Sequence, residues 1–471
     1  MRMDKREWIT FFTIALIFVL VEAKGLTVVT PGDENVYFYM AKSVTEGKIP
    51  YRDFFYAHPP LHIFILAAII KIFGVNIVAL KTATLVFLLT ASFFLYKTSV
   101  ELFKNIIGDK HAFLMSILTL IIFLFSFEIM FKATFSIGIN LSLMFLMMSF
   151  YFIFEKKYFI GGAFAGLAGL TRFYTLPPIF AISIFLFFKK NQEHRIRDFL
   201  FFAGGFTATF GIVVASLLIL FGQNFIQPAF SYHFLKPQLS NQKVIVYQSI
   251  LKEDWVILLA FSLSLFTRNK GKFQLFYLIL FIYLLFLLFI GVIAEFYFSI
   301  AFPFMAIIGS YSIVEIIRKV KMPQHGKYVL IFSIIIFFLW NTSADVMFLE
   351  RYGFMKFSPL DQLVAEIESA SQSQKLFGDD ATVTLVALLT NRSIALNFID
   401  SNEMRFTSGL TNFFIFRYQI EDENISHMIF RKTKGLYQIS QFRDYANSRC
   451  ALEKEYYDII EGSFLLYKCP K

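Results

Sequence analysis

The sequence predicts an α-helical polytopic membrane protein that carries a small α/β domain at its C-terminus. Hydrophobic residues make up 57% of the 471 residues, 64 of them Phe, and the mean hydropathy is +0.62. Apolar segments near the roughly 20 residues that a bilayer core requires recur along the first three quarters of the chain. After about Phe348, charges become frequent and apolar runs shrink to the length of strands or short helices.

About eleven apolar segments are candidates for membrane spans. They are Trp8–Val28, Ile77–Tyr96, Ala112–Phe127, Phe135–Phe154, Phe159–Leu170, Phe173–Phe188, Phe199–Phe221, Trp255–Phe266, Phe273–Ile293, Tyr297–Ile317 and Tyr328–Met347. Leu61–Phe73 is short for a span and follows two prolines, so we expect a helix that lies along the interface or against the bundle.

The positions of the charges predict the orientation of the spans. Every second connection is basic, as with Lys97, Lys156 and Arg318, and basic loops are typical of the cytoplasmic side. We therefore expect an integral protein of the cell membrane with a cytoplasmic N-terminus, a membrane domain over residues 1–347 and an extracytoplasmic domain over residues 348–471. The net charge of +10 is explained by these loops, without a nucleic-acid partner.

The C-terminal domain shows alternating strand and helix patterns. "KLFGDD" (375–380) and "IALNFID" (394–400) read as strands with a helix, "ATVTLVALLT" (381–390), between them. "RCALEKEYY" and "SFLLYKCP" could form a hairpin that brings Cys450 and Cys469 together. The outer face permits a disulfide there, and two unpaired thiols are the alternative.

Two adjacent acids, Asp33 and Glu34, directly follow the first span. The residues after them are apolar at helical spacing: Val36, Tyr37, Met40, Ala41 and Val44. We expect Asp33 to cap this helix and, as a partly desolvated carboxylate beside the membrane, to act as a general base. The alternative is an ordinary solvated turn acid.

The same outer loop holds "IPYRDFFYAHPPL". The prolines at 59 and 60 keep the backbone before them from being helical and fix the position of His58. The aromatic residues are typical of an interfacial belt. Asp53 and His58 within that belt are expected to hold a headgroup or a sugar.

Cations stand at the outer ends of several spans. Arg172 separates two apolar segments with almost no loop between them, and such an ionisable residue is a functional candidate with an anionic partner. For Lys81 and Lys236 the alternative is snorkelling to lipid headgroups. His233 and Tyr297 are weaker candidates for lining the same cavity, since they could be a surface histidine and a belt tyrosine.

Acids and cations at one membrane face fit an anionic lipid substrate. A leaving lipid phosphate needs Lys or Arg, and an incoming hydroxyl needs a base. The sequence has no phosphate-binding glycine-rich loop, which argues against a soluble nucleotide donor. A divalent metal is possible but is not indicated by ligand spacing, and we predict no cofactor.

These residues resemble membrane glycosyltransferases of the GT-C fold. The features are "DE" after the first span, the "PYRDFFYAHPPL" block, a cation near the second span, "GLAGLTR", "YHFLK" and an outer C-terminal domain. The resemblance is to the protein O-mannosyltransferase family and the lipid A aminoarabinose transferases. It implies a polyprenyl-phosphate-linked sugar as donor, an inverting transfer to a hydroxyl acceptor, and interfacial helices in the first outer loop.

The resemblance also implies roles for individual residues. Asp33 matches the family's base, and Arg172 matches a position that contacts the lipid phosphate. His233 aligns with a zinc-binding histidine of the aminoarabinose branch, but the glutamate that completes that site corresponds here to Ala57, so no zinc is expected. The remaining residues are predicted to bind substrate: Glu34, Tyr37, Asp53, His58, Lys81, Lys236 and Tyr297.

Other functions stay open at this stage. A lipid or solute transporter (a flippase, for example) would place ionisable residues near mid-membrane and show internal repeats, and neither is found. A scaffold for the outer domain would not need Asp33, His58 and Arg172. A polymerase or ligase acting on polyprenyl-linked oligosaccharides would share the outer-face chemistry.

Overall fold

The computed structural model describes residues 5–188, 194–236, 241–267, 270–320, 323–371 and 373–470. The chain forms two compact units, each assembled from separate segments. The first contains residues 1–26, 81–216 and 239–353, and the second contains residues 27–80, 217–238 and 354–471. The loop after the first predicted span, within residues 27–80, is therefore part of the same unit as the C-terminal domain.

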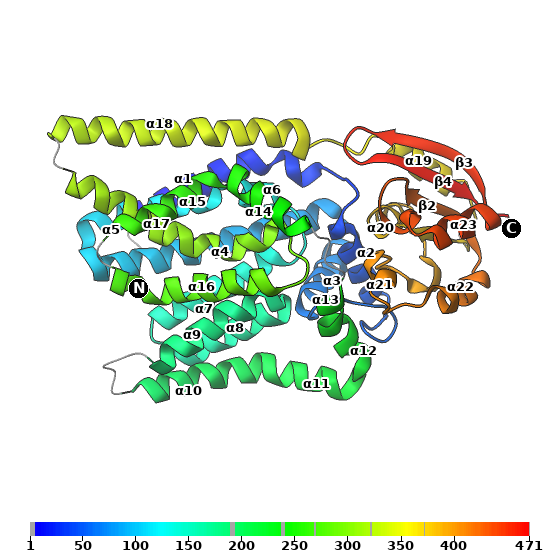
Figure 1. The fold of residues 1–471 in the computed structure, drawn as a ribbon, viewed down its shortest axis with the longest axis horizontal. Helices are drawn as coiled ribbons and strands as arrows, with labels where there is room; N and C mark the ends of the chain where they lie inside the picture. The colour runs from blue at the N-terminus through cyan, green and yellow to red at the C-terminus, as the bar shows by residue number, and fades with distance from the viewer. Residues whose placement is uncertain are drawn as a thin grey trace. The chain divides into compact units, whose positions relative to one another are not determined.

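The first unit is a bundle of apolar helices (Figure 1). Its helices are α1 (Lys5–Glu22), α4 (Ile77–Ile107), α5 (Asp109–Leu124), α6 (Phe127–Phe131), α7 (Ile139–Phe154), α8 (Tyr158–Thr171), α9 (Leu176–Phe188), α10 (Arg195–Phe206), α11 (Ile212–Phe221), α14 (Gln242–Glu253), α15 (Trp255–Ser262), α16 (Gln274–Phe289), α17 (Phe302–Lys319) and α18 (Gln324–Phe348). Each span expected from the sequence overlaps with such a helix.

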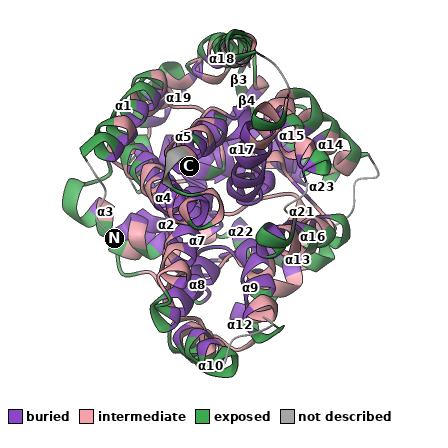
Figure 2. Ribbon diagram, turned by 90° about the vertical axis from the view of Figure 1, so that its left-hand side faces the viewer, coloured by how far each residue is buried: buried purple, intermediate pink, exposed green. Residues whose placement is uncertain are grey.

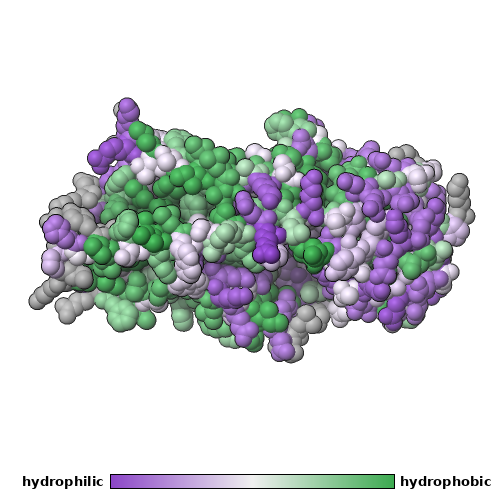
Figure 3. All heavy atoms as spheres, turned by 90° about the horizontal axis from the view of Figure 1, so that it is seen from above, coloured by the Kyte–Doolittle hydropathy of each residue, from purple (hydrophilic) through white to green (hydrophobic). Residues whose placement is uncertain are grey.

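Length and burial distinguish the helices of the bundle. Within the described residues, four stretches are long and apolar enough to cross a membrane: Ile77–Ile107, Arg195–Phe221, Gly271–Phe289 and Phe332–Gly353. Figure 2 shows α17 as largely buried, whereas α10 and α18 are mostly exposed. Figure 3 shows a largely apolar surface over the helices, as expected for side chains that face lipid.

Glycines bring α8 and α10 into close contact. A Cβ on Gly162 would lie 2.0 Å from the carbonyl oxygen of Phe202, and one on Gly205 would lie 2.0 Å from that of Phe159. The backbones can approach this closely only because these positions lack side chains. These glycines of α8 and α10 therefore allow the two helices to pack closely.

The second unit combines short helices with a four-stranded sheet. Its helices are α2 (Asp33–Thr45), α3 (Leu61–Phe73), α12 (Gln223–Ile226), α13 (Tyr232–Leu235), α19 (Leu360–Glu368), α20 (Asp380–Leu389), α21 (Met404–Thr407), α22 (Phe413–Glu421) and α23 (Ser440–Arg449). Its strands are β1 (Lys375–Gly378), β2 (Ile425–Arg431), β3 (Ala451–Asp458) and β4 (Gly462–Lys468), in the order β1-β2-β4-β3. β1 and β2 are parallel, and the other pairs are antiparallel.

One predicted strand is wrong. Residues 394–400 pair with β1 only through the isolated bridge Leu376–Ile394, and the chain then turns because Leu396 and Asn397 have positive φ angles of 54° and 50°. Tertiary contacts hold this turn: Lys48 Nζ donates to Asn397 Oδ1 at 2.7 Å. Local alternation of apolar residues cannot reveal such a contact.

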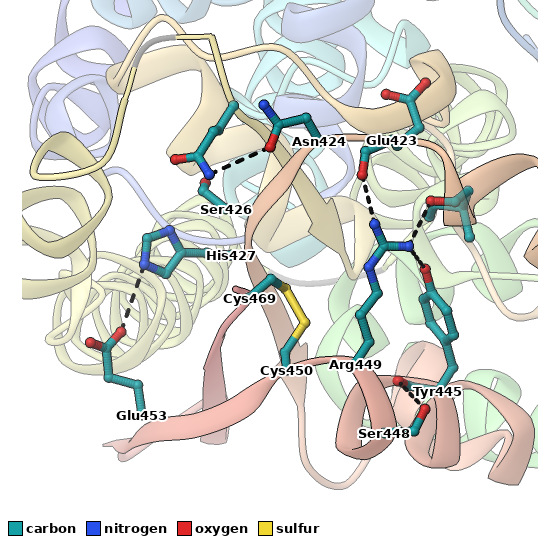
Figure 4. The surroundings of a disulfide bond; sticks show 12 residues. Glu423, Asn424, Ser426, His427, Tyr445, Ser448, Arg449, Cys450, Glu453 and Cys469 are labelled. Atoms are coloured by element: carbon teal, nitrogen blue, oxygen red, sulfur yellow. Dashed lines mark hydrogen bonds and ion pairs between the residues drawn. A yellow bond between two sulfur atoms is a disulfide. The ribbon is translucent and has the colours of Figure 1, made fainter. Parts of the chain in front are cut away.

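The expected hairpin is formed by β3 and β4, and a disulfide joins Cys450 to Cys469 (Figure 4). Next to it, the guanidinium of Arg449 donates to the carbonyl oxygens of Ile420 and Glu423. The bridge thus ties the end of α23 to the last strand, beside the core of the C-terminal domain.

Candidate active site

The opening of α2 places the two predicted acids differently. Asp33 is the first residue of the helix and is exposed, whereas Glu34 is buried, with 1% of its surface exposed. Gly32, not Asp33, is the N-cap residue, and the Asn35 amide fixes the preceding turn by donating to Thr30 O at 2.8 Å. The expected capping by Asp33 and its partial desolvation are therefore wrong, because the turn is closed by Asn35 and leaves Asp33 in solvent.

The loop after α2 is held by its own polar groups. The Asp53 carboxylate accepts the Ile49 N–H at 2.7 Å and forms an ion pair with Arg52 at 2.9 Å. The hydrogen bond from Arg52 lowers the pKa of Asp53. Tyr51 has a positive φ of 68°, and its hydroxyl donates to His58 O at 2.6 Å. Asp53 thus stabilises the turn that presents His58, and a left-handed non-glycine residue of this kind is often found at functional sites.

An aromatic group of side chains surrounds His58. The ring of His58 lies 5.9 Å from that of Tyr37 and 5.2 Å from that of His233. His233 is buried, and its Nε2 donates to the carbonyl oxygen of Ala57 at 2.6 Å. The structure thus brings together Tyr37, His58 and His233, three residues that lie far apart in the sequence or on different elements.

The residues around His233 do not fit a zinc site. Position 57 lies beside His233, but its alanine offers only a backbone carbonyl, which already accepts from the imidazole. Among the described residues, no group of three or more His, Cys, Asp or Glu side chains could hold a metal ion. We derive no catalytic step through a metal.

Lys236 follows the short helix α13 in the same unit. Its ammonium lies over the ring of Tyr232, 4.5 Å from the ring centre. Tyr232 in turn packs edge-on against Phe55 from the first outer loop, with ring centres 5.4 Å apart. Lys236 therefore contacts the same cluster of aromatic side chains that surrounds His58.

Arg172 lies in the first unit at the break between α8 and α9. Its backbone is extended (φ −149°, ψ 125°), which ends α8, and a short 3-10 turn follows before α9 begins. The side chain is buried, with 3% of the residue exposed, and its guanidinium donates to the Ile137 carbonyl oxygen. A buried guanidinium at a helix break is the arrangement expected for an anion site.

Tyrosines lie close to this break. The hydroxyls of Tyr174 and Tyr297 are 2.7 Å apart, and the hydroxyl of Tyr283 donates to Tyr297 O at 2.7 Å. Lys81, near the start of α4, is also buried in this unit, with 4% exposed. Tyr297 is thus part of a hydrogen-bonded tyrosine cluster that includes Tyr174, which follows Arg172 by two residues.

Several charged groups of the structure were not expected from the sequence. In the second unit these are Asp380, Asp400, Arg405 and Arg431, and in the first unit they are Glu128 and Asp254, whose carboxylate accepts the Glu128 N–H at 3.3 Å. The position of Glu128 in "FSFEIMF" could have indicated a functional residue, since a lone acid in an apolar segment is costly unless it has a role. The acids of the C-terminal domain gave no indication of function, because turn acids after a strand are common.

The helical bundle, the short helices α2 and α3 and the C-terminal sheet define the class of protein: a polytopic membrane protein with the GT-C fold. The chain is similar to ArnT from Cupriavidus metallidurans bound to undecaprenyl phosphate, with a TM-score of 0.67 and 10% identity over 99% of this chain and 100% of that one. The apo state of the same protein gives a TM-score of 0.68 and 9% identity, covering 98% and 99%.

Residues 57–219 match the family model described as dolichyl-phosphate-mannose-protein mannosyltransferase. This segment includes His58, Lys81 and Arg172 and leaves out Asp33. Comparison with curated protein sequences returns no match. The predicted fold and the resemblance to GT-C glycosyltransferases are confirmed.

Proposed function

We propose that this chain is an inverting glycosyltransferase that moves a monosaccharide, a hexose or a pentose, from a polyprenyl phosphate to a hydroxyl group. The reaction takes place at the outer face of the cell membrane, with the N-terminus in the cytoplasm and residues 348–471 outside. The acceptor is a hydroxyl of a protein, a lipid-linked glycan or a surface lipid.

The observation that carries the proposal is the match to ArnT over the full length of both chains, one of whose structures holds undecaprenyl phosphate. Residue chemistry supports it independently. Asp33 is an exposed carboxylate in the outer loop, and Arg172 is a buried guanidinium at a helix break. A base and a phosphate-binding cation are the two groups that such a transfer needs.

The proposed reaction is a single displacement. Asp33 takes the proton of the acceptor hydroxyl while the acceptor oxygen bonds to the anomeric carbon. The bond from that carbon to the phosphate oxygen breaks, and the electron pair leaves with the lipid phosphate, which Arg172 holds together with Lys81, His58 or Lys236. Because the phosphate is already a fair leaving group, no general acid is needed, in contrast to glycoside hydrolysis.

Binding of the carrier lipid tests the proposal directly. Purified full-length protein is titrated with undecaprenyl phosphate and followed by native mass spectrometry. We expect binding, and we expect Arg172→Gln to weaken it about 10- to 100-fold, because charge-assisted hydrogen bonds contribute roughly 1.5–3 kcal/mol. Arg318→Gln is the matched control. Arg318 belongs to the same unit but lies in the last turn of α17, where it is half-exposed and 3.5 Å from Glu315.

Two results would overturn the proposal. One is failure of the wild-type protein to bind undecaprenyl phosphate at all. The other is an unchanged set of surface glycans and glycolipids, by mass, after the gene is inactivated. A change in mass would identify the sugar that is transferred.

A further inference from the structure

The sheet of the C-terminal domain gathers charged residues at one edge. β1 ends at Gly378 and is followed by Asp379 and Asp380, and the parallel strand β2 ends at Arg431. The segment after Ile394 also starts parallel to β1, and it returns to the same edge, where Ser401 Oγ donates to Gly378 O at 2.6 Å. Asp380, Arg431 and Asp400 therefore follow three segments whose carboxyl ends meet, and this is where open α/β sheets bind ligands.

This edge is joined to the first outer loop within the second unit. Helix α20, which begins at Asp380, packs against α2, which begins at Asp33. Farther along α2, the Tyr39 hydroxyl donates to Arg392 O at 3.0 Å and accepts the Ile394 N–H at 3.2 Å, just beyond the end of α20. The two helices thus run side by side in the same direction, with Asp33 and Asp380 at the same end.

A second connection comes from Arg405 on α21. Its guanidinium is sandwiched between the rings of Phe55, in the first outer loop, and Phe398, 4.2 Å from each ring centre. Its Nη1 donates to Asp400 O at 2.6 Å. This arginine therefore lies between the loop that presents His58 and the acidic edge of the sheet.

The carboxylates at this edge accept different numbers of hydrogen bonds. The Asp379 carboxylate accepts the N–H groups of Arg431 and Leu436, one at each oxygen, and a Cβ on Gly435 would lie 2.2 Å from its Oδ1. Asp380 is 8% exposed and accepts only the N–H of Ala381 among the described hydrogen bonds, with Arg431 3.7 Å away.

Arg405 also has one N–H group that makes no hydrogen bond within the described part of the chain. The residue is 9% exposed, and within the described part of the chain its Nε–H has no hydrogen-bond acceptor. A buried guanidinium N–H without an acceptor is uncommon in folded proteins and calls for an explanation. A hydroxyl group of a bound ligand would supply the acceptor that this N–H lacks.

Charge at the edge fits a neutral ligand. Burial raises the pKa of Asp380 to about 8, with Arg431 opposing the shift and the charges of Asp400 and Asp33 adding to it. Burial also raises the pKa of Asp400, and Arg405 opposes that shift. A protonated carboxyl both donates and accepts, and a guanidinium donates, so the group can pair with several hydroxyls at once.

We propose that Asp380, Asp400 and Arg405 bind hydroxyl groups of the sugar being transferred, next to Asp33. The C-terminal domain then determines which sugar is accepted, while the bundle binds the lipid phosphate. This inference rests on the proposed function and assigns the sugar-binding part of it to the C-terminal domain. None of the three residues is a base or a nucleophile here, and they position the sugar.

The test compares lipids with and without a sugar. Full-length wild-type protein and the variants Asp380→Ala, Asp400→Ala and Arg405→Gln are titrated with undecaprenyl phosphate and with its mannose, glucose, galactose and arabinose esters. We expect the wild type to prefer at least one ester over the bare lipid. We expect each variant to lose about tenfold or more of that preference, as for removal of a hydrogen bond to a charged or buried partner, and to keep its affinity for the bare lipid.

Controls separate the inference from the fold and from the proposed function. Arg417→Gln removes an exposed guanidinium of the same domain, 3.0 Å from Glu421, and should change neither affinity. Retained binding of the bare lipid shows that a variant is folded, and Asp380→Asn, which keeps a donor and an acceptor in the place of the protonated acid, should retain the preference that Asp380→Ala loses. The inference is overturned if the wild type prefers none of the esters or if the variants keep the preference. If the wild type does not bind the bare lipid, the proposed function itself fails.

Discussion

Replacement of Asp33 by asparagine removes the proposed base with little change in structure. The residue is exposed and lies in the first turn of α2, where its charge interacts favourably with the helix dipole. Loss of that charge costs roughly 0.3–1 kcal/mol of stability. Loss of a general base costs about 10²–10⁴-fold in rate, which is about 2.7–5.4 kcal/mol in activation free energy.

The assay uses the cell's own donor. Membranes that contain equal amounts of folded wild-type or Asp33→Asn protein are mixed with the polyprenyl-phosphate lipid fraction extracted from cells lacking the gene. Initial rates of product formation are measured by mass spectrometry. We expect the Asp33→Asn rate to fall at least about 100-fold while binding of undecaprenyl phosphate is retained.

The matched control is Asp361→Asn. Asp361 is also an exposed acid in the first turn of a helix, α19, in the same unit. It should show the same small loss of stability and the wild-type rate. A rate for Asp33→Asn within about threefold of wild type, in a folded protein, would refute the assignment of Asp33 as the base, because no helix-dipole effect is large enough to hide a lost base.

Three further predictions concern the second unit. Cys450→Ser opens a loop closed across 19 residues and should lower the free energy of unfolding by about 3 kcal/mol, and the same loss should follow when the wild type is melted under reducing conditions. Tyr39→Phe leaves the buried Ile394 N–H without its acceptor and should cost about 1–3 kcal/mol in thermal unfolding, whereas a cost near zero would mean that α2 and α20 are held otherwise. Because burial raises the pKa of Asp380 to about 8, the folded chain holds this proton more tightly than the unfolded chain, and stability is lost as the pH rises from about 4 to about 8. Asp380→Asn removes that loss, so its unfolding temperature should rise relative to wild type between pH 5 and pH 9, and a difference independent of pH would contradict the reasoning.

Much of the fold could be predicted because its elements are set by local patterns. Hydrophobic length determines the spans, and helical spacing after Asp33 and the proline pair before Leu61 determine α2 and α3. The β3–β4 hairpin followed from strand-like runs separated by a turn. By contrast, the turn at Leu396 and Asn397 depends on a lysine almost 350 positions earlier in the chain, and no local pattern contains that information.

The candidate site likewise combines residues that local patterns could predict with residues that only tertiary contacts identify. The outer loop and Arg172 stood out because charge is costly next to a membrane, so each charged residue there called for a reason. Asp380 and Asp400 follow strand-like runs in a polar domain, where acids are ordinary. Their interest comes only from the packing of α20 against α2, which is a contact between residues far apart in sequence.

That packing also explains how an outer loop can keep an acid exposed beside two others. If Asp380 and Asp400 were both ionised, their charges would oppose the anionic form of Asp33, and a base needs that form. Burial keeps Asp380 largely protonated near neutral pH and shifts Asp400 in the same direction, with the guanidinium groups of Arg431 and Arg405 nearby. Three carboxyl groups can therefore lie close together, and the exposed one, Asp33, is the proposed base.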